Sequence, residues 1–425
     1  MPGRIEIHIN QLGPIHDTDI TLKPFMVFTG ESGTGKSYAA LLVHYVYKIL
    51  CTYESAGFFK SIGASYDKHR EQLPDENEGF LFEFTLKQFE EWCNKNAVRY
   101  IGESLGNFSL DSRVDIKFLG LEENYKFKYK RDIVEMDGEV SYFDSIQLND
   151  LPSLRLPYRS KKWDELPYMI LFRNYMLYIL RIKQKNTFIL PPSRGGLVCL
   201  NDVGRGNFLN SKGWMYNEFI SDFSNLKSAK PNEEVYTELS DSLINGKINI
   251  KDDDLYYEQA YGEIPITATA ASVKELAPFA LMLQKGLVGE YSIMFEEPET
   301  NLHPELQIKT ADTLAYLLQK GCRFQITTHS DYFLQRINQL IKLGKLKKKG
   351  VECQSVFSSI SDGIYIKEEK IAAYYFEKID KVNTTIKPLE IGKNGIPFST
   401  FFETVKKLSD EENRINNLLD TTYGC

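Results

Sequence analysis

The chain has 425 residues, a net charge of −7 at neutral pH and ordinary hydrophobic (42%) and charged (26%) fractions. This length allows more than one structural unit, and an aromatic content of 13% argues against extended disorder. The acidic balance gives no overall attraction to nucleic acid. No apolar stretch is long enough to span a bilayer, and the six cysteines form no C-x-x-C pair. We therefore expect a cytoplasmic protein.

The first 52 residues are predicted to form three strands, a loop and a helix. Ile5, Ile7 and Ile9 alternate with polar side chains in residues 4–10, as in a half-buried strand. Residues 15–22 indicate a second strand, and residues 25–29 are a short apolar run typical of a buried third strand. Residues 36–51 are predicted to be helical, which leaves the segment from residue 30 as the connecting loop.

This connecting loop, GESGTGKS, fits the pattern G-x-x-x-x-G-K-[ST] at every fixed position. Its glycines allow the backbone to fold into a ring of N–H groups around a triphosphate. Lys36 is expected to reach the β- and γ-phosphates, and the Ser37 hydroxyl is expected to bind Mg²⁺. A chance match is disfavoured by the strand before the loop and the helix after it. The predicted ligands are therefore a nucleoside triphosphate and Mg²⁺, held by Gly30, Glu31, Ser32, Gly33, Thr34, Gly35, Lys36, Ser37 and Tyr38.

Residues 53–185 are predicted to be an insert rich in strands and helices. Strand-like pieces cover residues 79–85, 112–119, 125–129 and 139–143, and a helical stretch covers residues 164–182. Sustained heptads are absent, which excludes a long coiled-coil arm. Neither Gln72 nor Gln88 stands in a convincing nucleotide-contacting loop.

Residues 186–360 are expected to complete the core. A strand at residues 186–190 leads into a loop that contains Arg194; a lone arginine is most often a surface charge, but this placement also allows a phosphate-facing or interface role. Residues 201–243 are predicted to be mostly helical. Residues 246–261 should form a strand pair around the triplet 252–254, three aspartates that we interpret as a solvated turn rather than a metal site.

A second motif follows the apolar strand at residues 291–295, which ends in Glu296-Glu297-Pro298-Glu299. A carboxylate at such a strand end can hold Mg²⁺, usually through water, and the next can polarise the water that attacks the γ-phosphate. We assign the first role to Glu296 and the second to Glu297. A helix is expected to begin at Pro304.

The third motif, Thr328-His329-Ser330, ends the next strand at residues 323–327. A strand, a crossover helix and a strand in this order pair as parallel neighbours. Glu297 and His329 should therefore lie at the same sheet edge as the phosphate loop. Beside these groups we favour a γ-phosphate sensor for His329 over a capping or core role.

Four segments carry a resemblance to a known family: the opening LGPIHDTDITLKPFMVFTG, the loop GESGTGKS, and the segments IMFEEPETNLHP and ITTHS. They resemble ATP-binding-cassette (ABC)-type ATPases of the AAA family in the RecF and overcoming-lysogenization-defect (OLD) group. The resemblance covers nearly the whole chain in order. It extends to the ATPase subunits of two-component bacterial anti-phage systems of the PARIS or Septu type. It implies an α/β P-loop NTPase of the ABC head type: one composite head with a mixed central sheet, an antiparallel-strand subdomain and a helical insert.

The resemblance also implies a signature helix before the carboxylate strand, supplied to the site by a facing subunit. The matching segment is residues 270–276, in which Ser272 and Lys274 would meet the partner's nucleotide. The signature helix of the family starts with serine-serine-glycine, and the matching residues here are Ala270, Ala271 and Ser272. At the end of the carboxylate strand, Glu296 replaces the family's usual aspartate. Both departures predict slow hydrolysis.

The last segment, residues 361–425, is expected to add a strand and an amphipathic helix at residues 398–419. A basic run before it could meet nucleic-acid phosphates, although such runs are more often solvated helix ends. Three functions remain open: an ATPase that dimerises around ATP and regulates a separate effector such as a nuclease or toxin, a nearly non-hydrolysing ATP-bound scaffold, and a DNA-repair ATPase of the RecF type. The basic run consists of Lys342, Lys345, Lys347, Lys348 and Lys349.

Overall fold

A computed structural model describes residues 3–72, 78–110, 112–136, 139–157, 162–200, 213–351, 363–392, 395–397 and 406–416. Its centre is a nine-stranded sheet in the order β5-β1-β2-β16-β15-β3-β14-β13-β9. These strands are β1 (Arg4–Leu12), β2 (Ile15–Thr21), β3 (Phe25–Gly30), β5 (Ser112–Leu119), β9 (Asn186–Leu190), β13 (Tyr291–Glu296), β14 (Arg323–Thr328), β15 (Ile371–Lys378) and β16 (Thr384–Pro388).

The central sheet is mixed. The five consecutive strands β15-β3-β14-β13-β9 pair in parallel with one another. The pairs β15–β16, β1–β2 and β1–β5 are antiparallel. The predicted α/β class with a mixed sheet is confirmed. The carboxyl ends of β3, β14 and β13 lie side by side at one edge, where open α/β sheets bind their ligands.

Two separate cores cover the two faces of this sheet. Met26 and Phe28 of β3 pack with α1 (Lys36–Cys51), whereas Phe25 and Val27 pack on the other face with α10 (Ala271–Gln284), α11 (Pro304–Gln319) and α12 (Asp331–Lys348). Burial on both faces explains why β3 is a continuous apolar run instead of an alternating one. The second core also includes α8 (Trp214–Ser228) and α9 (Thr237–Ile244).

Helix α4 (Leu86–Leu105) was not anticipated from the sequence, and it covers the outer strand of the central sheet. Thr85 and Gln88 form a capping box at its start. Asn94 and Glu90 accept hydrogen bonds from the backbone N–H groups of Ile116 (2.7 Å) and Phe118 (2.8 Å) on β5. These bonds satisfy part of an otherwise open sheet edge.

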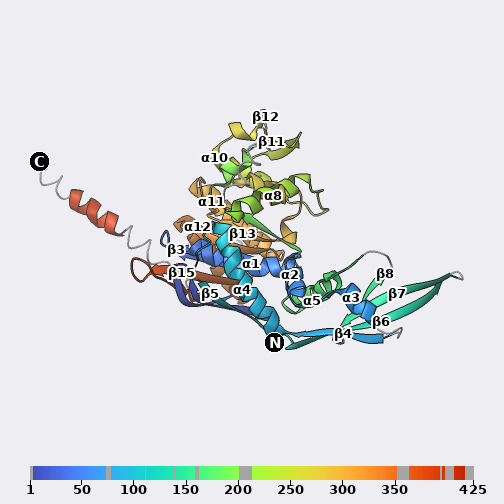
Figure 1. Ribbon diagram of the computed structural model, residues 1–425. Helices are drawn as coiled ribbons and strands as arrows, with labels where there is room; N and C mark the ends of the chain where they lie inside the picture. Colours follow the sequence, from blue (N-terminus) through green and yellow to red (C-terminus); the bar gives the residue numbers. More distant parts are fainter. Residues whose placement is uncertain are drawn as a thin grey trace, which may run out of the picture.

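A second, antiparallel sheet extends away from the main body as an arm (Figure 1). It consists of β4 (Glu78–Thr85), β6 (Asn124–Met136), β7 (Glu139–Leu148) and β8 (Leu154–Pro157), and its helices are α2 (Ala56–Ser61), α3 (Tyr66–Gln72) and α5 (Leu166–Ile179). The strands expected within residues 53–185 are thus present, but β5 joins the central sheet and not the arm.

The remaining elements are small. They are α6 (Arg194–Val198), the three-stranded sheet β10 (Lys247–Lys251), β11 (Asp254–Gln259) and β12 (Gly262–Pro265), and the 3₁₀ turns η1 (Ile266–Ala268), η2 (Val288–Glu290) and η3 (Glu368–Lys370). Residues 406–416 are helical, and each of them is exposed; the two ends of the helix predicted at 398–419 lie outside the described residues. Among the described helices, none combines the length and apolar character needed to cross a membrane.

Candidate nucleotide-binding site

The phosphate loop lies between β3 and α1, as predicted, and its glycines are required by its shape. Gly33 (φ 71°) and Gly35 (φ 92°) have left-handed backbones, and Gly35 forms the N-cap of α1. A Cβ atom on Gly30 would lie 2.3 Å from the backbone oxygen of Phe376 on β15. The Thr34 hydroxyl donates to the Glu31 backbone oxygen at 2.7 Å, which closes the loop on itself.

Lys36 is buried, and its Nζ donates to the backbone oxygens of Gly30 (3.1 Å) and Glu31. Burial lowers its pKa to about 8, although Glu297, Glu296 and other nearby carboxylates oppose this shift. A bound phosphate would add negative charge beside Nζ and so favour the protonated form. Lys36 is therefore placed to hold an anion within the loop.

Glu296 ends β13 beside Ser37 of the loop. The residue is 2% exposed, and neither carboxylate oxygen has a hydrogen-bond partner among the described residues. Burial raises its pKa to about 7, although the nearby Ser37 hydroxyl and the cations of Arg194 and Lys36 lower it. An unpaired buried carboxylate beside a hydroxyl provides the oxygen ligands that Mg²⁺ prefers, and Mg²⁺ is commonly held by one or two carboxylates together with phosphates. The two residues thus fit the predicted magnesium site.

Glu297 follows with a left-handed backbone (φ 43°), an uncommon conformation for a residue with a side chain. Its N–H donates to the backbone oxygen (3.0 Å) and the hydroxyl (3.2 Å) of Thr327 on β14. The Thr300 hydroxyl donates to its Oε2 at 3.1 Å. The Glu297 carboxylate also acts on the pKa values of both Lys36 and His329, which places these three side chains near one another.

Glu299 connects this loop to the histidine motif. Its Oε1 accepts hydrogen bonds from the Thr328 hydroxyl (2.8 Å) and the His329 backbone N–H (2.6 Å). Burial, followed by the charge of Lys36, lowers the pKa of His329, so the imidazole is neutral at pH 7. The sequence interpretation gave Glu299 no role; the third carboxylate in Glu296-Glu297-Pro298-Glu299 was the available signal.

Replacing Glu299 with alanine is expected to lower ATP turnover about tenfold and to reduce the free energy of unfolding by about 1–3 kcal/mol, because two donors to a charged group lose their acceptor. Glu299→Gln keeps an acceptor oxygen and should lose less than half as much of each. Steady-state phosphate release and urea denaturation would measure both. Equal turnover in Glu299→Ala and the unaltered protein would contradict a positioning role.

Other predicted residues lie outside this cluster. Ser272 and Lys274 occupy the first turn of α10, and among the described residues no hydrogen bond or ion pair joins them to the phosphate loop. Their contact with a facing subunit stays a prediction. Tyr38 is half-buried against the turn at Gly13. The Gln88 side chain is used in the capping box of α4.

The basic run lies on the last turns of α12, where positive charge suits a helix C-terminus. Lys345 pairs with Glu368 at 3.6 Å and also donates to backbone oxygens, and the Lys347 ammonium lies 4.9 Å from the Tyr365 ring centroid. Part of this charge is therefore used within the fold.

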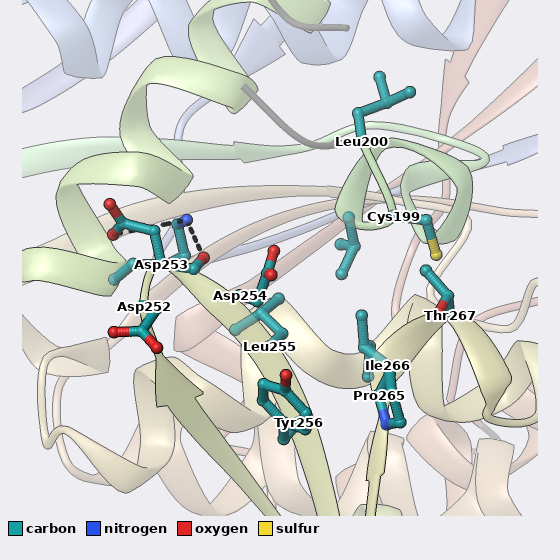
Figure 2. A pocket seen from close by; sticks show the side chains of 12 residues that line it. Cys199, Leu200, Asp252, Asp253, Asp254, Leu255, Tyr256, Pro265, Ile266 and Thr267 are labelled. Atoms are coloured by element: carbon teal, nitrogen blue, oxygen red, sulfur yellow. Dashed lines mark hydrogen bonds and ion pairs between the residues drawn. The ribbon is translucent and has the colours of Figure 1, made fainter. Parts of the chain in front are cut away.

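The aspartates of residues 252–254 line a separate cavity of about 330 Å³ (Figure 2). Asp252 and Asp253 form the exposed β10–β11 turn with left-handed backbones, and Lys227 Nζ donates to the Asp253 backbone oxygen at 2.6 Å. Across the described residues, no group of three or more His, Cys, Asp or Glu side chains is arranged to hold a metal ion. These observations agree with the interpretation of residues 252–254 as a solvated turn.

Residues 208–334 match the family model of the AAA ATPase domain. This segment contains the Glu296–Glu299 loop and His329 but not the phosphate loop. The match indicates an AAA-type ATPase domain over this segment, and the phosphate-loop geometry between β3 and α1 agrees with nucleotide binding. No curated protein matches the sequence significantly.

Solved structures with a similar arrangement include an SMC head bound to the C-winged helix domain of ScpA (TM-score 0.37, 13% identity, covering 91% of this chain and 97% of that one). The SMC head domain from Thermotoga maritima gives a TM-score of 0.33 at 11% identity, covering 92% of this chain and 100% of that one. An SMC head with an extended coiled coil, bound to the C-terminal domain of ScpA derived from Pyrococcus furiosus, gives 0.37 at 11% identity, covering 97% and 100%.

Proposed function

We propose that this chain is a Mg-ATP-dependent ATPase whose heads dimerise around nucleotide. The observation that carries the proposal is the convergence of Lys36, Glu296, Glu297 and His329 at the adjacent carboxyl ends of β3, β13 and β14. These are the groups that phosphoryl transfer to water requires: a phosphate-binding cation, metal ligands, a base and a γ-phosphate contact.

Each residue has one role in this proposal. Lys36 and the loop N–H groups bind the phosphates, and Ser37 and Glu296 would hold Mg²⁺, which neutralises phosphate charge when bound. Glu297 orients the attacking water and accepts its proton as the oxygen bonds to the γ-phosphorus and the bond to the β-phosphate oxygen breaks. His329 donates a hydrogen bond to the γ-phosphate. Calorimetric titration with ATP, followed by phosphate-release assays, tests these roles.

The dimer part of the proposal assigns Ser272 and Lys274 to the nucleotide of a facing subunit. Its support is the resemblance together with the lack of any hydrogen bond or ion pair between these described residues and their own phosphate loop. A nucleotide bound between two subunits stabilises their association by linkage. The arrangement would place two nucleotides in a symmetric dimer, alone or within a larger assembly.

Light scattering tests this assembly. Glu297→Gln, which should retain bound ATP, is expected to shift from monomer to dimer when ATP is saturating, and the Lys36→Ala/Glu297→Gln double variant should not respond. A Glu297→Gln protein that is monomeric with and without ATP would contradict the dimer.

We further propose that the conformational output passes to a separate effector, such as a nuclease or toxin, in anti-phage defence. The support is the resemblance to two-component systems. Co-expression with the product of the neighbouring gene, followed by DNA and RNA cleavage and phage-protection assays, tests this. Metal-dependent cleavage by the purified chain alone, or salt-sensitive DNA binding lost on mutating Lys342 and Lys348, would favour an independent nucleic-acid role.

A further inference from the structure

Arg194 has no part in the mechanism above, yet it is among the most buried polar side chains in the described chain. It follows β9 at the start of α6 and is 0% exposed, so its interpretation as a surface charge is wrong. Burial lowers its pKa to about 10, which leaves the guanidinium charged at neutral pH. A buried cation of this kind carries a large desolvation cost, and an apolar side chain of similar volume would often pack there at lower cost.

The guanidinium of Arg194 joins three elements through backbone oxygens. Its Nε donates to Glu275 on α10 at 2.9 Å. Its Nη1 donates to Pro191 after β9 at 3.1 Å and to Glu296 at the end of β13 at 2.9 Å. The guanidinium also lies 4.6 Å from the ring centroid of Phe295. One planar group therefore fixes the metal-binding end of β13 relative to the first turns of α10.

The charges around Arg194 extend this connection. The Glu275 carboxylate, 3% exposed, lies 3.6 Å from Arg194 Nε and accepts a hydrogen bond from Asn301 Nδ2 at 3.2 Å. Asn301 belongs to the segment that follows Glu297 and Glu299. A Cβ atom on Gly195 would lie 3.0 Å from Glu275 Oε1, so α6 and α10 are in close contact. Arg194 Nη2 and Glu275 Oε2 have no hydrogen-bond partner among the described residues.

We infer that Arg194 is a positioning residue that couples the N-terminal part of α10, through Glu275, to the backbone of Glu296, so that ordering of Glu296 orders this part of α10. The inference rests on the proposed function. The physical reason is that a guanidinium has a fixed fork of donors: a shift of α10 cannot be absorbed by a flexible side chain and must move the Glu296 backbone or break a hydrogen bond. In a dimer, the same contact would connect each subunit's own nucleotide to the helix that meets its partner's nucleotide.

Hydrogen exchange followed by mass spectrometry can test the coupling, with the full chain kept at a concentration where light scattering shows a monomer. In the unaltered protein, Mg-ATP should slow exchange of peptides covering residues 30–37 and 271–277, the latter roughly tenfold. In Arg194→Lys, which keeps the charge but not the fork, residues 30–37 should respond as before. Its response at residues 271–277 should fall below about twofold.

Asn301→Gly is a second variant that accepts the left-handed backbone of residue 301 (φ 59°) and removes the side chain that donates to Glu275. We expect it to weaken the α10 response partially, and it decides the question if Arg194→Lys does not fold. Undiminished slowing at residues 271–277 in whichever variant folds would overturn the coupling. If exchange in the variant is faster throughout the chain but Mg-ATP still slows residues 271–277 fully, Arg194 contributes only to stability. That result would also overturn the coupling. No response at residues 30–37 in the unaltered protein would instead overturn the proposed function, and the coupling with it.

Discussion

Replacing Lys36 with alanine is expected to abolish Mg-ATP binding, whereas Glu297→Gln should leave binding intact and lower turnover by roughly 10²–10⁴-fold. The difference follows from the site. Lys36 lies inside the phosphate loop and acts on ground-state phosphates, but Glu297 acts on the attacking water and so contributes mainly in the transition state. Calorimetry with ATP and single-turnover phosphate release would separate the two effects.

Matched controls exist on α11. Lys309→Ala and Glu305→Gln change exposed side chains of the same types and should leave affinity and turnover unchanged. Equal ATP affinity in Lys36→Ala and the unaltered protein would contradict the assignment of the loop. If Glu297→Gln hydrolyses ATP at the normal rate, Glu297 is not the base.

Glu296→Gln is expected to stop Mg-dependent turnover while stabilising the metal-free protein at pH 8. Burial raises the pKa of Glu296 from 4.5 to about 7, so at pH 8 the folded chain carries an ionised carboxylate that is better solvated when unfolded. A shift of this size corresponds to about 3 kcal/mol of destabilisation at pH 8. Glutamine has nearly the same shape without the charge, so it should recover roughly 2–3 kcal/mol.

The pH dependence gives this prediction its sign. The pKa of Glu296 is higher in the folded than in the unfolded chain, so protonation of this carboxylate favours the folded state. This contribution to the free energy of unfolding is complete below pH 4.5 and is lost as the pH rises through about 7. The advantage of Glu296→Gln should therefore be largest at pH 8 and shrink as the pH falls from 7 toward 4.5. Urea denaturation in EDTA at pH 8, 6.5 and 5.5 would measure it. A variant less stable than the unaltered protein at pH 8 would contradict the unpaired buried carboxylate.

Helix α4 shows a signal that the sequence contained but that was not interpreted. Phe89, Cys93, Ala97 and Ile101 recur at helical spacing and are all buried, and Thr85 with Gln88 marks the helix start. Both patterns lie within one short segment, so they can be recognised without knowing what the helix packs against.

The sequence by itself determined β3, the phosphate loop and α1, because an apolar run, glycines that accept left-handed backbones and a helical pattern act within about 30 residues. It also determined the edge shared by Glu297 and His329, since parallel pairing follows from the order of strand, helix and strand. Only the tertiary structure decided the roles of Glu299 and Arg194. Their partners are about 30 and 80 to 100 residues away, and whether a charge is buried or solvated depends on which distant backbone groups reach it. The same reason applies to β15 and β16, which lie between β2 and β3 in the sheet although more than 300 residues separate them in the chain.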